Sequence, residues 1–293
     1  MTNLLPAAPR GRRNTSTALA LPDPAVDKLS KARHDAFLRA RGIDPNGPFQ
    51  LEIWPADMRE MPNDYARSAL FTVRNKTEPR ATFETSLIFH VQKEVKITYT
   101  GVELRADDDE LVWQQILDYA KHKPLGEPIE FNLHQLCVDL NWSINGRNYD
   151  KARKSISRLK ANEVRVENER HGRGVALSLI REYAFQGDGD KGTKYQIWIH
   201  PGLITLFAGN TSTRVQWEQY RELTPLARRL FDYFASHKAP FPLKLDTFKG
   251  MCASSCSIER KWRSMVRKAC EEIRLAGLVK KAWVDDDLIY VDR

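Results

Sequence analysis

A repeated order of apolar and polar segments, offset by 114 residues, constrains this fold more than any other feature. Leu117-Asp118-Tyr119 corresponds to Phe231-Asp232-Tyr233, and Ile156 corresponds to Cys270. Apolar positions coincide through a series of helix, strand, helix, helix and strand. We interpret this as the duplication of one module. The alternative is coincidence, because few residues are identical.

The spacing of apolar residues, with capping and turn residues between them, predicts the elements of each copy. In the first copy we expect a helix over 109–121, a strand over 129–131, helices over 133–140 and 146–161, and strands over 164–183 and 194–200 around a turn at 187–192. In the second we expect helices over 224–236, 246–252 and 258–276, a strand over 243–245, and a hairpin of 279–284 with 288–291. Alternating residues between 86 and 99 predict further strands.

A helix, a turn, a second helix and a hairpin form a winged helix, a variant of the DNA-binding helix-turn-helix. The predicted fold class is therefore α+β, with two tandem winged-helix domains. We expect a flexible tail over 1–48, containing at most a short helix over 26–41. The first domain, with extra strands, would cover 49–215, and the second would cover 216–293.

Positive charge is concentrated in the third helix of each copy. Residues 145–165 carry seven basic and two acidic side chains, and residues 259–281 carry eight basic and three acidic ones. Each window has a net charge of +5, whereas the whole chain has +8, so the remainder is slightly negative. This distribution favours two nucleic-acid contacts over a uniformly solvated surface.

On a helical wheel the basic residues form a stripe apart from the apolar face. Tyr149, Ala152 and Ile156 would be buried in the first copy, and Trp262 and Ala269 in the second. A helix of this kind fits the major groove, where arginine can pair with guanine and lysine with phosphate. The alternative is that each stripe is only a solvated face. The predicted DNA-binding residues of the two helices and hairpins are Asn145, Arg147, Asn148, Lys151, Lys154, Arg158, Arg170, Arg173, Ser257, Arg260, Lys261, Arg263, Arg267, Lys280 and Lys281.

The sequence lacks the signs of a membrane protein, a secreted protein or a metalloenzyme. No apolar run approaches ~20 residues, and prolines interrupt the N-terminus, so we expect a cytoplasmic protein. Four cysteines are too few for a disulfide scaffold, and neither they nor the seven histidines have metal-site spacing. Asp107-Asp108-Asp109 could hold a divalent cation, but a helix start is the preferred interpretation. We expect no metal, no cofactor and no enzymatic activity; a nuclease or relaxase is the alternative of a different class.

Several long segments resemble the TrfA replication initiators of broad-host-range plasmids, and the resemblance covers about residues 50–293. The segments are 54–58, 61–64, 66–72, 95–115, 142–147 and 227–234. The resemblance implies two winged-helix domains that bind directly repeated origin sites called iterons. It also implies active monomers with dimers as a storage form, opening of an AT-rich region, and recruitment of the host DnaA initiator and DnaB-type helicase.

The family also carries a clamp-binding pentapeptide, which corresponds here to Gln50-Leu51-Glu52-Ile53-Trp54. Gln50 and Leu51 match it, whereas Ile53 and Trp54 are apolar replacements. These residues are candidates for docking on the polymerase sliding clamp. The alternative is that they begin the first strand.

The predicted function is therefore that of a plasmid replication initiator that binds iterons in double-stranded DNA. A winged-helix transcriptional regulator that represses its own gene is the alternative, since base-reading chemistry alone does not separate the two.

Overall fold

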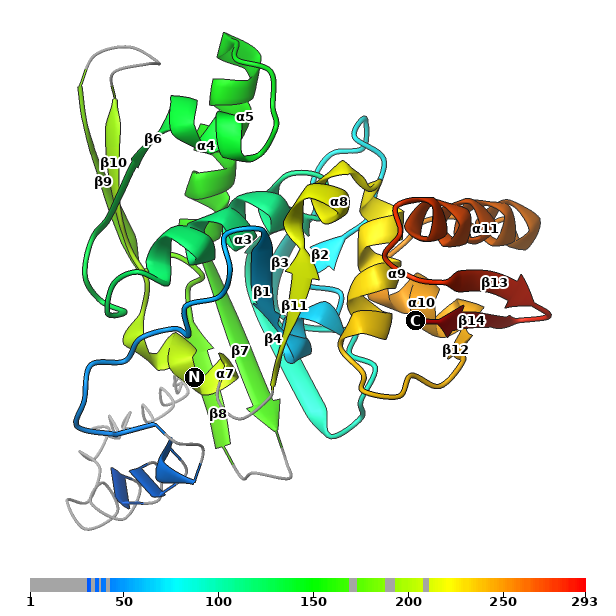
Figure 1. The fold of residues 1–293 in the computed structure, drawn as a ribbon, viewed down its shortest axis with the longest axis horizontal. Helices are drawn as coiled ribbons and strands as arrows, with labels where there is room; N and C mark the ends of the chain where they lie inside the picture. Colours follow the sequence, from blue (N-terminus) through cyan, green and yellow to red (C-terminus); the bar gives the residue numbers. More distant parts are fainter. Residues whose placement is uncertain are drawn as a thin grey trace, which may run out of the picture.

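The computed structural model describes residues 31–32, 35–36, 38–40, 43–168, 173–187, 193–207 and 211–293. Most of the predicted tail over 1–48 lies outside these residues, as does Arg170. Within the predicted helix over 26–41, residues 31–32, 35–36 and 38–39 are helical. From residue 43 onward the described chain is a mixed α/β structure (Figure 1).

Helix α3 (Asp109–Ala120) lies at the centre of the larger part of the molecule (Figure 1). Its side chains are buried nearly all round, and Trp113 and Ile116 are fully enclosed. A helix that buries residues on every side belongs to a core rather than to a surface. The helix contacts α4, α5 and strands of three sheets, so it fixes the position of the elements that follow it.

A four-stranded antiparallel sheet packs beside α3. It consists of β3 (Thr82–Ile88), β4 (Val95–Val102), β7 (Asn162–Asn168) and β8 (Arg173–Leu177), in that order. On β4, Val95, Ile97 and Tyr99 are buried in alternation with more exposed residues. Ile97 pairs with Val166, so β7 extends the same apolar face.

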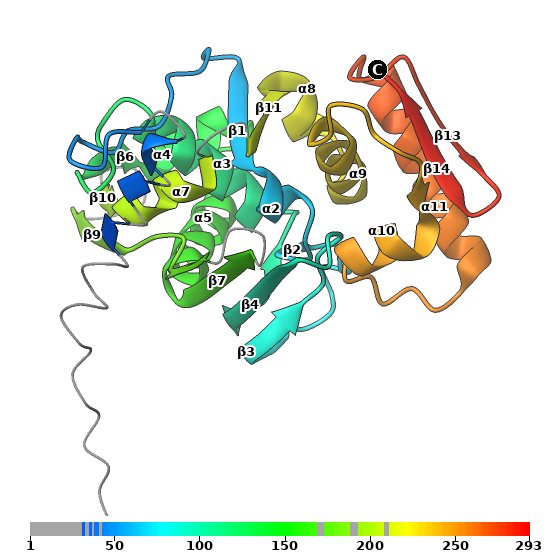
Figure 2. The ribbon, with the colours of Figure 1, turned by 90° about the horizontal axis from the view of Figure 1, so that it is seen from below.

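Two smaller units have the same strand order (Figures 1 and 2). The first contains β6 (Ile129–Asn132), α4 (Leu133–Asp139), α5 (Gly146–Lys160), β9 (Glu182–Gln186) and β10 (Lys194–Trp198). The second contains β12 (Leu243–Lys244), α10 (Leu245–Met251), α11 (Glu259–Leu275), β13 (Lys281–Asp285) and β14 (Leu288–Asp292). In each unit the first strand pairs with the last strand of the hairpin. We call α4 with α5 the first helix pair and α10 with α11 the second helix pair.

The hairpin of the first unit is not the one that the sequence alignment indicated. The offset of 114 residues makes Val164 the counterpart of Leu278, which precedes the second hairpin, but β7 and β8 belong to the four-stranded sheet. The physical reason is that Val164 and Val166 of β7 can be buried against β4 directly after α5 ends. In the first unit, the place that corresponds to the second hairpin is taken by β9 and β10. Strand β10 pairs with β6.

The remaining elements join the two units. They are β1 (Met58–Pro62), α2 (Asn63–Ala66), β2 (Phe71–Thr72), β5 (Leu104–Arg105), η2 (Pro201–Leu203), α7 (Ile204–Phe207), β11 (Ser212–Gln216), α8 (Trp217–Glu222) and α9 (Pro225–Ala235). Strands β1 and β11 pair antiparallel, and β2 and β5 pair parallel. The boundary predicted between residues 215 and 216 thus falls inside β11.

Helix α9 joins the second unit to the rest of the chain through a buried arginine. The Arg229 guanidinium is completely buried and donates to Glu110 at 3.0 Å and to Asp232 at 2.9 Å. It also donates to the carbonyls of Ala66 and Ser68, at 2.9 and 2.7 Å. Because a buried ion pair is costly to break, this network holds α9 firmly against α2 and α3. None of the helices in the described ranges is long and apolar enough to cross a bilayer.

Candidate nucleic-acid interface

The first helix pair presents the start of α5 to solvent. The Asn145 side chain caps α5 by accepting a hydrogen bond from the Asn148 amide at 2.9 Å. The Asn148 side chain donates to the Ser143 carbonyl at 2.7 Å. Both predicted base-contacting asparagines therefore also shape the turn before α5. Arg147 is exposed between them, and no ion pair with another described residue engages it.

The predicted basic stripe occupies one face of α5. Arg147, Lys151 and Lys154 line a groove of about 740 Å³ between α5 and residues 76–80. The Lys151 ammonium lies 3.9 Å from the centre of the Trp142 ring, a cation–π contact that fixes its direction. The opposite face of α5, including Tyr149, is buried as expected.

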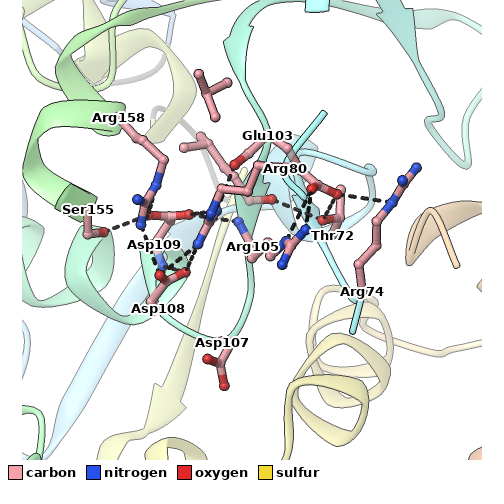
Figure 3. Close-up of polar contacts among 12 residues, drawn as sticks. Thr72, Arg74, Arg80, Glu103, Arg105, Asp107, Asp108, Asp109, Ser155 and Arg158 are labelled. Atoms are coloured by element: carbon pink, nitrogen blue, oxygen red, sulfur yellow. Dashed lines mark hydrogen bonds and ion pairs between the residues drawn. The ribbon is translucent and has the colours of Figure 1, made fainter. Parts of the chain in front are cut away.

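Arg158, at the other end of the stripe, does not face an outside partner. Its guanidinium donates to Asp108 at 2.9 Å and to Asp109 at 2.7 Å, and only 14% of its side chain is exposed (Figure 3). Arg80 binds the same two carboxylates, with contacts of 2.7 to 2.8 Å. The prediction that Arg158 contacts DNA is therefore corrected: it ties α5 to the start of α3.

The same contacts decide the role of the three successive aspartates. Burial, followed by the negative charge of Asp108, raises the pKa of Asp109 to about 6, against the lowering effect of Arg158 and Arg80. Burial also acts to raise the pKa of Asp108, but Arg80 and Arg158 outweigh it, so that pKa lies below its ordinary value. At neutral pH two carboxylates thus face two guanidinium groups. In the described part of the chain, no group of three histidine, cysteine, aspartate or glutamate residues is arranged to hold a metal.

The second helix pair exposes the first turns of α11. Ser257, Arg260, Lys261 and Arg267 are all exposed, as expected for groove-facing positions. The buried face is centred on Trp262, whose indole donates to the Leu245 carbonyl at 3.1 Å and so holds α11 against α10. The start of α11 is therefore a cationic surface on a firmly packed helix.

Arg263 has an additional role that the sequence did not indicate. Its guanidinium donates to the Asp287 carboxylate at 2.6 Å and to the carbonyl of Asp286, in the turn between β13 and β14. It therefore fixes the hairpin relative to α11, and its availability for a base is reduced. Lys280 and Lys281, at the start of this hairpin, are exposed, and their contact with DNA stays a prediction.

The predicted hairpin contact of the first unit is also corrected. Arg173 belongs to β8 in the four-stranded sheet, and Arg170 lies outside the described residues. The hairpin that accompanies the first helix pair is β9–β10, whose tip over 188–192 lies outside the described residues as well. Its sequence signal was the glycine- and aspartate-rich stretch between two apolar segments, and its strand β10 pairs with β6.

Two apolar residues of the proposed clamp segment belong to the core. Leu51 and Trp54 are each 2% exposed, and the Trp54 indole donates to Asp118 at 2.9 Å. Gln50, Glu52 and Ile53 are exposed, and the Gln50 side chain donates to the Lys121 carbonyl at 3.2 Å. The segment forms no strand. Docking on a clamp would require both anchors to leave the core, at about 1.5–3 kcal/mol each.

The sequence did not single out the other cations of the groove. Lys76 and Arg80 lie between β2 and β3, and Arg105 ends β5; nothing in their local pattern distinguishes them from ordinary surface residues. The Arg105 side chain instead binds the buried Glu103 carboxylate at 2.9 Å, and Arg74 lies 3.1 Å from the same group (Figure 3). Of these three, Lys76 is the most exposed, at 74%, and its ammonium lies 3.0 Å from the Asp107 carboxylate.

Comparisons with known proteins agree with the resemblance. A model of the TrfA protein family matches residues 26–293. The chain is 54% identical over 245 residues to the plasmid replication initiator protein TrfA of Escherichia coli. The aligned region covers 84% of this chain and 64% of the relative. The match spans 64% of that relative's length, slightly less than two thirds.

A solved structure of domains 2 and 3 of RctB has a related fold. Its TM-score is 0.53 at 12% identity, and the match covers 79% of this chain and 96% of that one. At this identity the likeness concerns the mixed α/β fold alone. On the family match and the 54% identity, the chain belongs to the TrfA family.

Proposed function

We propose that this chain starts plasmid replication by binding direct repeats in double-stranded DNA. It would do so with two winged-helix domains, over 49–215 and 216–293, in which α5 and α11 enter successive major grooves. The observation that supports this most strongly is the occurrence of two exposed, cationic helix starts, at Arg147 and Arg260, in units of the same strand order. Membership of the TrfA family supports the same function.

The proposal includes partners that a replication initiator needs. We expect the bound protein to open the adjacent AT-rich DNA, to recruit host DnaA and a DnaB-type helicase, and to switch between monomer and dimer in the bacterial cytoplasm. We expect binding rather than catalysis, because Asp108 and Asp109, the carboxylates considered for a cation, pair with Arg80 and Arg158. Clamp binding through Gln50–Trp54 is left out, because Leu51 and Trp54 are core residues.

A plasmid-maintenance assay tests this function. A plasmid that carries the cognate repeats should persist in a host otherwise unable to copy it, provided that the wild-type chain is supplied. The double variant Arg147→Ala, Arg260→Ala should lose the plasmid although it folds normally. If the wild type binds the repeats and represses a neighbouring promoter, yet never maintains the plasmid, the chain is a transcriptional regulator.

A further inference from the structure

The groove beside α5 has a second wall that belongs to neither helix pair. This wall is the segment 75–80, between β2 and β3, with Lys76 at its exposed tip. We propose that the groove and Lys76 hold the sugar–phosphate backbone of the duplex where it passes from the first helix pair to the second. This inference rests on the proposed function and adds a contact site to it.

The position of the segment favours this path. On one side it lines the groove with Arg147 and Lys154 of α5. On the other side it reaches the turn of the second helix pair, where the Val73 amide donates to the Cys252 carbonyl at 2.8 Å. The Ser255 hydroxyl, in the same turn, lies 3.3 Å from the Glu78 carboxylate. In both views the segment lies between the two helix pairs (Figures 1 and 2).

Seven basic side chains line the groove against four acidic ones, so its net charge favours an anion. Asp107 lies between two ammonium groups, 3.0 Å from Lys76 and 3.9 Å from Lys151. Burial lowers the pKa of Lys151, although Asp107 and Asp108 act against this effect, so a further anion would favour its charged form. A phosphate could therefore share or replace the contacts that Asp107 now makes.

The chemistry of these cations indicates phosphate rather than base edges. Arg80 and Arg158 are saturated by Asp108 and Asp109, which leaves mainly lysines facing the open groove. A lysine ammonium acts as a point charge and positions the duplex without reading its sequence. The site should therefore contribute equally to specific and non-specific duplexes.

Salt-dependent binding of duplex DNA tests the site. Lys76→Ala should weaken binding to both repeat and random duplexes by roughly three- to tenfold, and reduce the log–log salt slope by about 1. Asp107→Asn should tighten binding to both, because it removes a negative charge from the path of the backbone. Both side chains are at least partly exposed, so thermal unfolding should confirm that the variants fold.

Lys93→Ala is the matched control. Lys93 is exposed and follows β3, whereas segment 75–80 precedes it, so Lys93 lies at the opposite end of the strand. If Lys76→Ala binds like Lys93→Ala with an unchanged slope, while the wild type still prefers the repeats, the groove proposal is wrong. If the wild type shows no preference for the repeats, the proposed function fails instead. A uniform loss with Lys76→Ala supports the groove in either case.

Discussion

In each unit, one charged side chain of the longer helix holds that helix against the rest of the protein. The two side chains occupy corresponding positions but carry opposite charges. In the first unit, Arg158 donates to two carboxylates at the start of α3. In the second, the residue 114 positions later is Glu272, which accepts hydrogen bonds from the amide and hydroxyl of Thr224 at 2.5 and 2.7 Å. Thr224 is the residue that caps α9.

The contacts of Arg158 and of Glu272 also differ in how far they are buried. Asp109 is fully buried and Arg158 nearly so, whereas Thr224 is exposed and Glu272 half-buried. A buried pair leaves an uncompensated charge when one partner is lost, but an exposed contact is replaced by water. The helix that would read DNA is therefore anchored electrostatically in the first unit and mainly by apolar packing in the second.

The largest expected effect is that of Arg158→Ala. It leaves Asp108 and Asp109 with Arg80 as their only guanidinium partner, and should lower the free energy of unfolding by about 3–5 kcal/mol. Urea denaturation measures this loss. Arg274→Ala, which removes an exposed pair with Glu271 on α11, is the matched control and should leave the midpoint unchanged. Equal midpoints for the two variants would show that the buried Arg158 ion pairs stabilise the fold no more than the exposed pair does.

The next largest effects concern binding. Arg147→Ala and Arg260→Ala should each weaken binding to the repeats by about 1–3 kcal/mol and relax the preference for one base position. Arg263→Ala should lose less specificity, because its guanidinium already serves the hairpin turn at Asp287. Equilibrium titration against repeats with single base changes separates these results. Equal relaxation by all three variants would contradict the distinction between Arg263 and the two exposed arginines.

The smallest effect should come from Glu272→Ala. It removes two hydrogen bonds at the start of α9, which should cost about 1 kcal/mol of unfolding free energy. Glu272→Gln keeps an acceptor and should retain part of this stability. If Glu272→Ala loses as much unfolding free energy as Arg158→Ala, the exposed contact and the buried ion pairs stabilise the protein equally.

The sequence predicted the helices of both units because local signals determine them. Asn145 before α5 and Thr224-Pro225 before α9 are capping sequences that act within one turn, and apolar spacing gave the buried faces. The partner of β6 could not be predicted in this way. β7 and β10 both carry alternating apolar residues, and only packing against β4 decides between them.

Long-range charge pairing was equally hidden from the sequence. The stripe from Arg147 to Arg158 is uniform on a helical wheel, but its last member lies over Asp108 and Asp109. Those carboxylates are about 50 residues earlier in the chain. Nothing in the local pattern distinguishes an arginine that binds outside partners from one that stabilises the fold.

Hydroxyl-radical footprinting on a duplex with one repeat tests most directly whether both helix pairs contact the same DNA. The wild type should protect two stretches on one face, about 10 base pairs apart. Arg147→Ala should lose protection in one stretch and Arg260→Ala in the other. If both variants lose the same stretch, or if neither alters the pattern, the two helix pairs do not bind one duplex as described.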